Sequence, residues 1–271
     1  MGTLAVRHPA VAGQFYPDQQ EKLLASLNTY LHPTAKPVPA RGCVVPHAGY
    51  MYSGHVAGAV YARVRIPARC LVLCPNHTGM GTPLSIMSRG AWETPLGSVP
   101  IDAELAEELM RRFPLLSEDS AAHRTEHAIE VQLPFLQVLR KDLRFVPIAI
   151  GTRQFDVLET LGQAIGEVLS ASHEPILVVA SSDMNHYESD PVTRVKDQKA
   201  IEPILALDAR GLYEAVIGEK ISMCGYGPTV AMLTAVKQLG ATSAELVKYA
   251  TSGDISGDRQ MVVGYAGIIV R

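Results

Sequence analysis

Three histidines of this 271-residue chain lie just after short apolar segments, and their chemistry is that of metal ligands: His47, His77 and His186. Neutral imidazole is the commonest protein ligand for zinc, iron and copper. A mononuclear site with an open position for chemistry needs three or four protein ligands. We predict that His47 and His77 supply two of them. At this point three residues are candidates for the third ligand: Asp183, His186 or Cys224.

Cys224 lies in a glycine-containing segment, Ser222-Met223-Cys224-Gly225-Tyr226-Gly227-Pro228. Gly227-Pro228 is typical of the first turn of a helix. A thiol at a helix N-terminus has its thiolate favoured by the helix dipole, and metals bind the thiolate. The alternative is that Cys224 is a small loop residue without a chemical role.

The segment Glu126–Pro134 also carries groups that can take part in chemistry. His127 and Glu130 are three residues apart, so they share a face if the segment is helical. One such pair does not make the di-iron core of helical bundles, which needs two copies. We expect His127 to line the cleft or orient a ligand, with a capping or structural role as the alternative. Glu126 is expected in the first turn of the helix, where its charge complements the dipole.

Short apolar segments alternate with amphipathic ones along the chain, which predicts a three-layer α/β sandwich with a mostly parallel, mixed central sheet. The closing pair of strands can be antiparallel. We expect one domain over residues 1–271, with its cleft beyond the carboxyl ends of the strands. Asp18, Ser53 and Asp102 are expected at helix N-termini. Strands are predicted at 42–46, 69–74, 84–88, 145–150, 175–180, 244–251 and 261–270, and helices at 54–64, 102–112, 126–140, 154–170, 191–207, 208–218 and 226–239. A further helix is expected after Asp18, carrying Leu23, Leu24, Leu27 and Leu31.

The composition excludes several classes of protein. Hydrophobic residues make up 47% and charged residues 19%, which excludes a disordered polymer, a coiled coil and a collagen-like repeat. The 24 basic and 27 acidic residues give a net charge of −3, without the basic surface that nucleic acid requires. The sequence has neither a signal peptide nor an apolar stretch long enough to span a membrane, so we expect a cytoplasmic protein. Cys43, Cys70 and Cys74 are expected as reduced thiols in the core.

Several motifs, kept in order along the chain, make this sequence resemble the Memo family, the B component of the AmmeMemoRadiSam system. The match runs from near the first residue to the last. The motifs that carry it are Arg7–Pro17, Val45–Gly54, Pro75–Gly79, Glu126–Pro134, Ser181–Tyr187, Met223–Gly225 and Gly264–Gly267.

The resemblance implies an α/β domain similar to class III extradiol ring-cleaving dioxygenases, which hold non-haem Fe(II) with two histidines and a carboxylate. It implies His47, His77 and Cys224 as the metal ligands. His186 takes the acid/base position with Asp183 near it, and His127 completes the predicted catalytic set. A thiolate replaces the carboxylate, which favours copper, zinc or thiolate-bound iron. We predict Fe(II) as the metal, with copper and zinc as alternatives.

The function predicted is that of a non-haem iron (or copper) oxidoreductase. Its substrate is a small molecule, aromatic if the dioxygenase likeness extends to the substrate. The resemblance also implies two partners, a radical S-adenosylmethionine enzyme and its small partner protein. Two alternatives belong to other classes: an iron- or copper-handling redox protein without turnover, and a peptide- or phosphopeptide-binding module.

Overall fold

The computed structural model describes residues 5–32 and 36–271, and a mixed sheet runs through its centre. The strand order is β10-β12-β2-β9-β3-β8-β4-β7. One more strand, β11, lies outside this order and pairs with β12. This is a mixed α/β fold, as predicted. The strands are β2 (Gly42–Val45), β3 (Arg69–Pro75), β4 (Leu84–Ile86), β7 (Ser117–Glu118), β8 (Arg144–Ile150), β9 (Ile176–Ser181), β10 (His186–Glu188), β11 (Ala244–Thr251) and β12 (Val262–Val270).

The middle of the sheet is parallel: β2 pairs with β9, β9 with β3, and β3 with β8. Nearly every residue of these four strands is buried, which explains why they read as unbroken apolar segments in the sequence. The closing strands β11 and β12 are antiparallel, and β12 also pairs antiparallel with β2. The third predicted strand is shorter than expected, and it runs antiparallel to β8.

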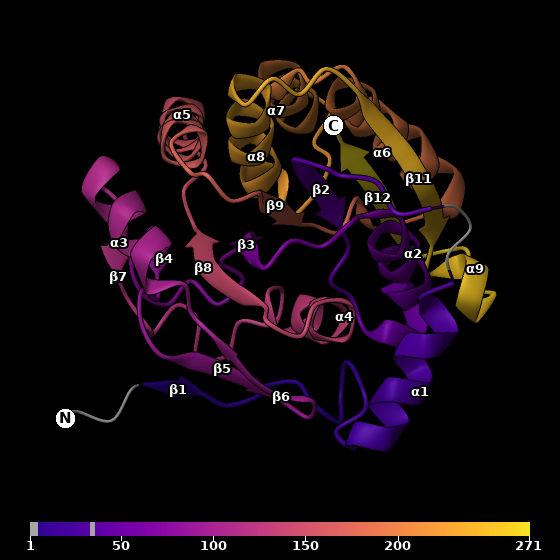
Figure 1. Cartoon of the computed structure of the whole chain (residues 1–271). Coiled ribbons are helices and arrows are strands. Elements are labelled where there is room, and N and C mark those ends of the chain that lie inside the picture. The colour runs from indigo at the N-terminus through magenta and orange to yellow at the C-terminus, as the bar shows by residue number, and fades with distance from the viewer. Residues whose placement is uncertain (1–4, 33–35) are drawn as a thin grey trace.

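Helices cover both faces of the sheet (Figure 1). Two separate apolar cores result, one on each face, because the side chains of each buried strand alternate between them. A short helix, α9 (Gly253–Ser256), precedes β12. One face carries α3 (Ala103–Arg112), α5 (Phe155–Ser170), α6 (Asp190–Leu205), α7 (Ala209–Gly218) and α8 (Tyr226–Gln238), and the other carries α1 (Gln20–Tyr30), α2 (Tyr50–Arg63) and α4 (Leu133–Leu139).

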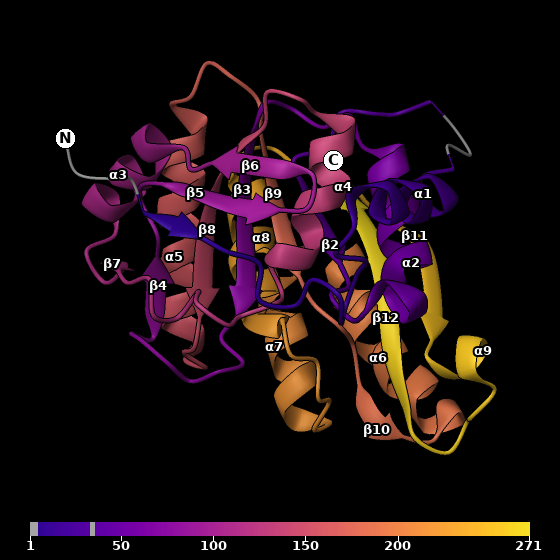
Figure 2. The same ribbon diagram turned by 90° about the horizontal axis from the view of Figure 1, so that it is seen from below.

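A small second sheet, which the sequence analysis did not predict, lies on the side of α4 (Figures 1 and 2). It has the order β1-β5-β6, with β1 (Val6–Arg7) parallel to β5 (Ala91–Thr94) and β6 (Gly97–Pro100) antiparallel to it. These strands are two to four residues long, too short to show a clear period of two.

Two of the three predicted helix N-caps are wrong. Helix α1 begins after Gln19, which makes no side-chain cap, rather than after Asp18. Helix α2 begins after Gly49, so Ser53 lies within its first turn and donates a hydrogen bond from Oγ to the Ala48 carbonyl. Asp102 is confirmed, because its carboxylate accepts a hydrogen bond from the Leu105 N–H.

The predicted helix at 126–140 is also wrong in its first part. Residues 126–129 form no helix, and a 3₁₀ turn, η1 (Glu130–Gln132), precedes the short helix α4. Pro134 lies in the first turn of α4, a position that proline favours because its missing N–H needs no partner there. The change of conformation frees Glu126 and His127 from a helix surface and allows both to face the carboxyl end of the sheet.

The carboxyl ends of the parallel strands bring the candidate residues together. Figure 2 shows the arrowheads of β3 and β8 at the same edge of the sheet. His47 follows β2, His77 follows β3 and Asp183 follows β9. This edge is therefore where side chains far apart in the sequence meet, as the general rule for open α/β sheets predicts.

Cys43, Cys70 and Cys74 are free and buried, as predicted. Burial raises the pKa of each thiol, so all three stay protonated and pack as small apolar groups. Within the described ranges, no helix has the length and apolar character needed to cross a bilayer.

A carboxylate at the first turn of α6 ties this helix to the end of β11. Asp190 accepts hydrogen bonds from Arg194, Thr251 and Arg259. Chiefly through the bond from Arg194, its pKa falls from 3.8 to about 2. A carboxylate with a lowered pKa stabilises the fold at neutral pH, and that contribution disappears as the pH falls from about 4 to about 2.

We expect Asp190→Asn to lower the free energy of unfolding at pH 7 and to make it depend less on pH between 3.8 and about 2. Urea unfolding across a pH series measures both effects. Asp156→Asn, at an exposed carboxylate of α5, is the matched control. If Asp190→Asn lost stability with falling pH as steeply as the control, the role assigned to the Asp190 carboxylate would be contradicted.

Candidate metal centre

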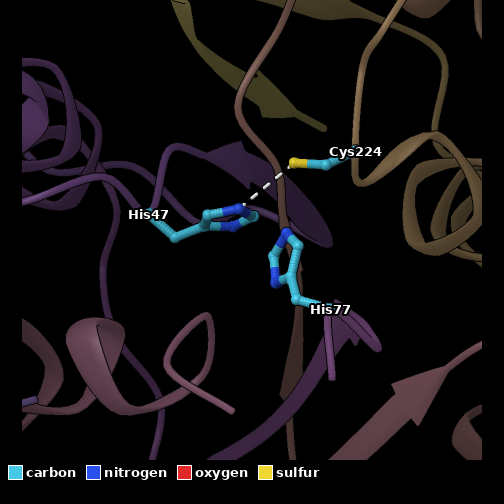
Figure 3. Close-up of side chains that lie close together, drawn as sticks. All are labelled: His47, His77 and Cys224. Carbon is cyan, nitrogen blue, oxygen red and sulfur yellow. Dashed lines mark hydrogen bonds between the residues drawn. The ribbon is translucent and has the colours of Figure 1, made fainter. Parts of the chain in front are cut away.

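His47, His77 and Cys224 come together at the carboxyl edge of the sheet, with one donor atom from each within 4.8 Å of the others. The Cys224 sulfur lies 3.2 Å from Nε2 of His47. Figure 3 shows both rings and the sulfur pointing toward a common point. Two donors bound to one zinc ion lie at most about 4.4 Å apart, so the observed spacing is that of a site able to close around one ion.

A chain of hydrogen bonds fixes the tautomer of His47. Ser181 Oγ donates to the Ala128 carbonyl, which can only accept, at 2.6 Å. Nδ1 of His47 lies 2.9 Å from the same oxygen, so the ring must be the donor there. Nε2 therefore keeps its lone pair and faces the sulfur. Burial, followed by the neighbouring histidines, holds the pKa of His47 well below 6.5, so the ring is neutral.

Gln132 supports this arrangement from the opposite side. Its Oε1 accepts from the Tyr61 hydroxyl, and its Nε2 donates to Ser181 Oγ and to the Pro46 carbonyl. Gln132 and Ser181 are completely buried. All the polar atoms around the His47 ring are thus satisfied in one arrangement, which leaves the ring little freedom to turn.

Glu126 fixes the tautomer of His77. One carboxylate oxygen lies 2.9 Å from Nδ1 of His77, and the other accepts from the His77 backbone N–H at 2.7 Å. Burial alone would raise the pKa of Glu126, but His77 and the Ala128 N–H together hold it below 4.5. The carboxylate is therefore charged, and Nδ1 carries a proton. Burial lowers the pKa of His77, but the hydrogen bond and the charge of Glu126 outweigh it and raise this pKa above 6.5. Nε2 is the nitrogen left for a metal, which displaces any proton there when it binds. A histidine held by a carboxylate in this way is a common feature of protein metal sites.

Cys224 approaches from the loop before α8, directly ahead of the N-cap residue Gly225. A Cβ on Gly225 would lie 2.4 Å from the Ser181 carbonyl oxygen, so only glycine allows the loop to come this close to β9. The Gly225 N–H donates to Ser182 Oγ. Burial, and then the Asp183 carboxylate, raise the pKa of the Cys224 thiol, so the free protein holds a thiol beside a neutral imidazole.

A cavity of about 560 Å³, which we call the histidine cavity, opens beside these three residues. It contains the other predicted site residues, His127, His186 and Asp183. Its lining consists of Phe15, His47, Ala48, Gly49, His77, His127, Asp183, His186, Tyr187, Ser222, Cys224 and Val263.

His127 lies flat against His77 in this cavity, with ring centroids 4.8 Å apart. The rings of Phe15, at 4.7 Å, and His47, at 5.4 Å, are also its neighbours. Burial lowers the pKa of His127, so it too is neutral. The expectation that His127 and Glu130 share a helix face is wrong. Glu130 is buried elsewhere, where it pairs with Arg7 at 2.8 Å and accepts from the Tyr16 hydroxyl.

His186 presents a free ring nitrogen. Its Nδ1 lies 3.0 Å from the Ser222 carbonyl, an acceptor, so Nδ1 carries the proton and Nε2 keeps its lone pair. Burial lowers the pKa of the ring despite that hydrogen bond. Asn185 Oδ1 accepts from both the N–H and the hydroxyl of Ser222, which fixes the loop that holds His186. The ring can therefore accept a proton at Nε2.

Asp183 lines the same cavity as His186, near which the sequence analysis places it, but among the described residues its carboxylate makes no hydrogen bond to that ring. Its carboxylate accepts from the His47 N–H at 2.7 Å, so it holds the backbone of the first ligand. Burial raises the pKa of Asp183 to about 7 in spite of the hydrogen bonds from the His47 and Ala48 N–H groups. Tyr50 is likewise turned away from the site and donates to the Val131 carbonyl inside the core.

The donor set fits a transition-metal ion. Two imidazole nitrogens and a sulfur match zinc, copper and iron better than magnesium or calcium, which prefer oxygen ligands. A second group of close side chains, His77, Glu126 and His127, fits less well. Both Glu126 oxygens are already bound to His77, and a metal there would have to displace those bonds.

Four residues that support the site were missed by the sequence analysis: Glu126 in its present role, Ser181, Gln132 and Ser222. Each acts by accepting or donating hydrogen bonds to another site residue. One signal was available in the sequence, since Glu126, Gln132 and Ser181 all lie inside the motifs that carry the family resemblance.

Comparison with known proteins gives consistent matches. A family model described as Memo-like protein matches residues 7–269. MEMO1 family protein MK0963 of Methanopyrus kandleri is 45% identical over 279 residues, covering 98% of this chain and 99% of the relative. MEMO1 family protein Mbar_A1422 of Methanosarcina barkeri is 46% identical over 269 residues, covering 98% and 100%.

A solved structure shares the fold. Uncharacterized protein JW3007 from Escherichia coli K12 superimposes with a TM-score of 0.56, covering 84% of this chain and 98% of that one. The two are 13% identical in sequence, so this likeness concerns the fold alone.

We expect Glu126→Gln to weaken metal binding about 10–100-fold, because the amide no longer fixes the proton on Nδ1 of His77. Titration of the metal-free protein with Zn²⁺ against a competing chelator measures the affinity. Glu107→Gln, at an exposed carboxylate of α3, is the control. An unchanged affinity in a Glu126→Gln protein that unfolds at the wild-type temperature would contradict the role assigned to this carboxylate.

Proposed function

This chain belongs to the Memo family, and we propose that it is a metal-dependent oxidoreductase whose ion is held by His47, His77 and Cys224. Iron(II) is the proposed metal, with copper or zinc as the alternatives. The substrate is a small molecule that enters the histidine cavity, and an aromatic ring fits the aromatic and imidazole side chains there.

One observation carries this proposal: each histidine is held by its Nδ1, so that both Nε2 atoms are left to face the sulfur. A buried histidine without a metal is most stable when both ring nitrogens have partners, and Nε2 of the buried His47 faces only the Cys224 sulfur. Hydrogen bonds that hold only Nδ1 are what a metal ligand needs, because the other nitrogen must bind the ion.

Bound iron or copper supplies one-electron chemistry with dioxygen that no side chain can perform. The protein's own residues supply the rest. The histidine cavity, at about 560 Å³, has the size of a small-molecule site. His186 accepts a proton from the substrate at Nε2, His127 and Phe15 offer flat faces to an aromatic ring, and Asp183 holds the His47 backbone in place.

Further parts of the proposal rest on the family resemblance. They are a single domain over residues 1–271 with the three-layer arrangement of class III extradiol dioxygenases, and a cytoplasmic location. They also include joint action with a radical S-adenosylmethionine enzyme and its small partner protein. The mixed sheet covered by helices on both faces supports the fold assignment.

A second candidate function is iron or copper handling without turnover. The sulfur ligand supports it, because a thiolate in place of a carboxylate favours Cu(I) over the hard, oxygen-rich site of a dioxygenase. Tight Cu(I) binding without oxygen consumption would favour this function over the oxidoreductase. A protein that binds neither iron nor copper would favour a peptide-binding module instead.

We expect His47→Ala, His77→Ala and Cys224→Ser each to lose most of the metal that the wild-type protein carries, because two remaining ligands do not hold an ion against a chelator. Elemental analysis of proteins loaded with Fe(II) or Cu(I) and then passed over a chelating column measures the content. His173→Ala, at an exposed histidine, is the control. Equal metal stoichiometry in the three variants and the wild type would rule out the ligand set.

We expect His186→Gln to keep the metal content and to slow oxygen consumption with aromatic diols by about 10²–10⁴-fold, because it removes the proton acceptor alone. An oxygen electrode measures the rate with metal-loaded protein and a panel of catechols. His173→Gln is again the control. A rate in His186→Gln equal to that of the control would contradict the acid/base role.

A further inference from the structure

A second cavity, of about 590 Å³, lies on the other side of the metal cluster. It shares three lining residues with the histidine cavity: His77, Ser222 and Cys224. Its remaining walls come from the loop after β8, the end of α7 and the first turn of α8. A molecule bound there touches the candidate metal ligands from a second direction. We call it the basic cavity, after the residues described next.

The basic cavity is lined by two cations, Arg153 and Lys220, and none of the residues that line it is acidic. Neither cation forms an ion pair with any residue in the described part of the chain, whereas most arginines there do. Two unpaired cations beside a concave surface create a positive potential that attracts an anion.

A polar group without a partner in the described part of the chain also belongs to the lining of the basic cavity. The hydroxyl oxygen of Tyr226 is buried and makes no hydrogen bond. The Arg153 charge opposes the rise in the Tyr226 pKa that burial causes, so the guanidinium and the phenol act on the same region of the cavity. Tyr226 and Gly227 are also the first two residues of the 13-residue helix α8. The N–H groups of these two residues have no partner within the helix, because they lie in its first turn. All these groups donate hydrogen bonds, and an oxyanion accepts them.

Lys220 occupies a position where a side chain is unfavourable. Helix α7 ends in a Schellman motif, in which the Ile221 N–H donates to the Val216 carbonyl and the Lys220 N–H to the Ile217 carbonyl. Lys220 is the residue with left-handed backbone, at φ 52°, and glycine is the usual residue there. Leu207 adopts the same left-handed backbone, at φ 55°, at the end of α6, so this fold accepts a side chain there. At the end of α7 this conformation brings Lys220 into the lining of the basic cavity.

We propose that the basic cavity binds the oxyanion group, carboxylate or phosphate, of the substrate, and that Arg153, Lys220 and the Tyr226 hydroxyl hold it. The attached part of the substrate then lies against His77 and Cys224. This inference rests on the proposed function, which supplies the substrate that carries the oxyanion. The anion site itself does not require the metal.

The test uses the full-length, metal-free protein and two probes, inorganic phosphate and benzoate, with binding measured by calorimetric titration. We expect saturable binding of at least one probe, and a loss of about tenfold or more in Arg153→Gln and in Lys220→Gln. Tyr226→Phe should weaken it less. Arg65→Gln removes an exposed arginine that lines neither cavity, and it should leave binding unchanged.

One further variant separates binding from folding. Lys220→Gly supplies the residue that the helix end favours, so it should raise the unfolding temperature while it weakens anion binding as much as Lys220→Gln does. Lys220→Arg should keep the binding. Phosphate binding alone indicates phosphorylated substrates, and benzoate binding alone indicates aromatic carboxylates.

Two results would overturn the inference: no saturable binding of either probe, or a loss in Arg65→Gln equal to that in Arg153→Gln. Metal content, measured separately, distinguishes this failure from failure of the proposed function. A protein that binds metal but no anion refutes the anion site alone. A protein that binds anions but no metal refutes the metal centre and leaves the anion site.

Discussion

Two hydrogen bonds to the far side of the histidine rings determine what this site can do. Ser181 accepts from Nδ1 of His47, and Glu126 accepts from Nδ1 of His77. Each bond occupies Nδ1 and leaves Nε2 as the nitrogen that faces the cluster with Cys224. If either ring took the other tautomer, an N–H would face the cluster, and the site would repel a cation. The chemistry of the cavity therefore depends on an oxygen atom behind each ring.

The register of the central sheet places those oxygens. In the parallel pair β2–β9, Val45 lies opposite Ser181, two residues before His47, so the serine hydroxyl reaches the ring from the neighbouring strand. β3 lies on the other side of β9 and delivers His77 to the same edge. Gly225 then allows the loop that carries Cys224 to pack against the end of β9. Five segments far apart in the sequence meet at this edge, because adjacent parallel strands end together there. They are the segments that carry His47, His77, Glu126, Ser181 and Cys224.

The site is flanked by two cavities of different character. The histidine cavity contains four imidazoles, an aromatic ring and a carboxylate whose pKa is about 7. Burial lowers the pKa of three of these imidazoles, those of His47, His127 and His186. The basic cavity contains two cations that form no ion pair with any described residue, and a tyrosine whose hydroxyl oxygen is buried. A substrate with an apolar ring and an anionic group would find a suitable surface on each side of the same three residues.

Much of the fold could be predicted from the sequence, because buried parallel strands such as β3 and β9 are continuous apolar segments. The small sheet β1-β5-β6 could not, since its strands are too short for a period to show. The residues that meet at the site could be predicted because each histidine follows a strand. The residues that hold them by hydrogen bonds could not be predicted. A helix was expected where Glu126 turns inward, and nothing in the sequence places Ser181 behind His47. Such contacts depend on register, and register depends on the whole sheet.

The measurement that tests the central claim most directly is X-ray absorption at the zinc edge of the zinc-loaded protein. The account predicts one sulfur neighbour at about 2.3 Å and two imidazole nitrogens at about 2.0–2.1 Å. It also predicts that the sulfur signal disappears in Cys224→Ser. A spectrum with oxygen and nitrogen neighbours alone, or one unchanged by that substitution, would show that the ion binds elsewhere.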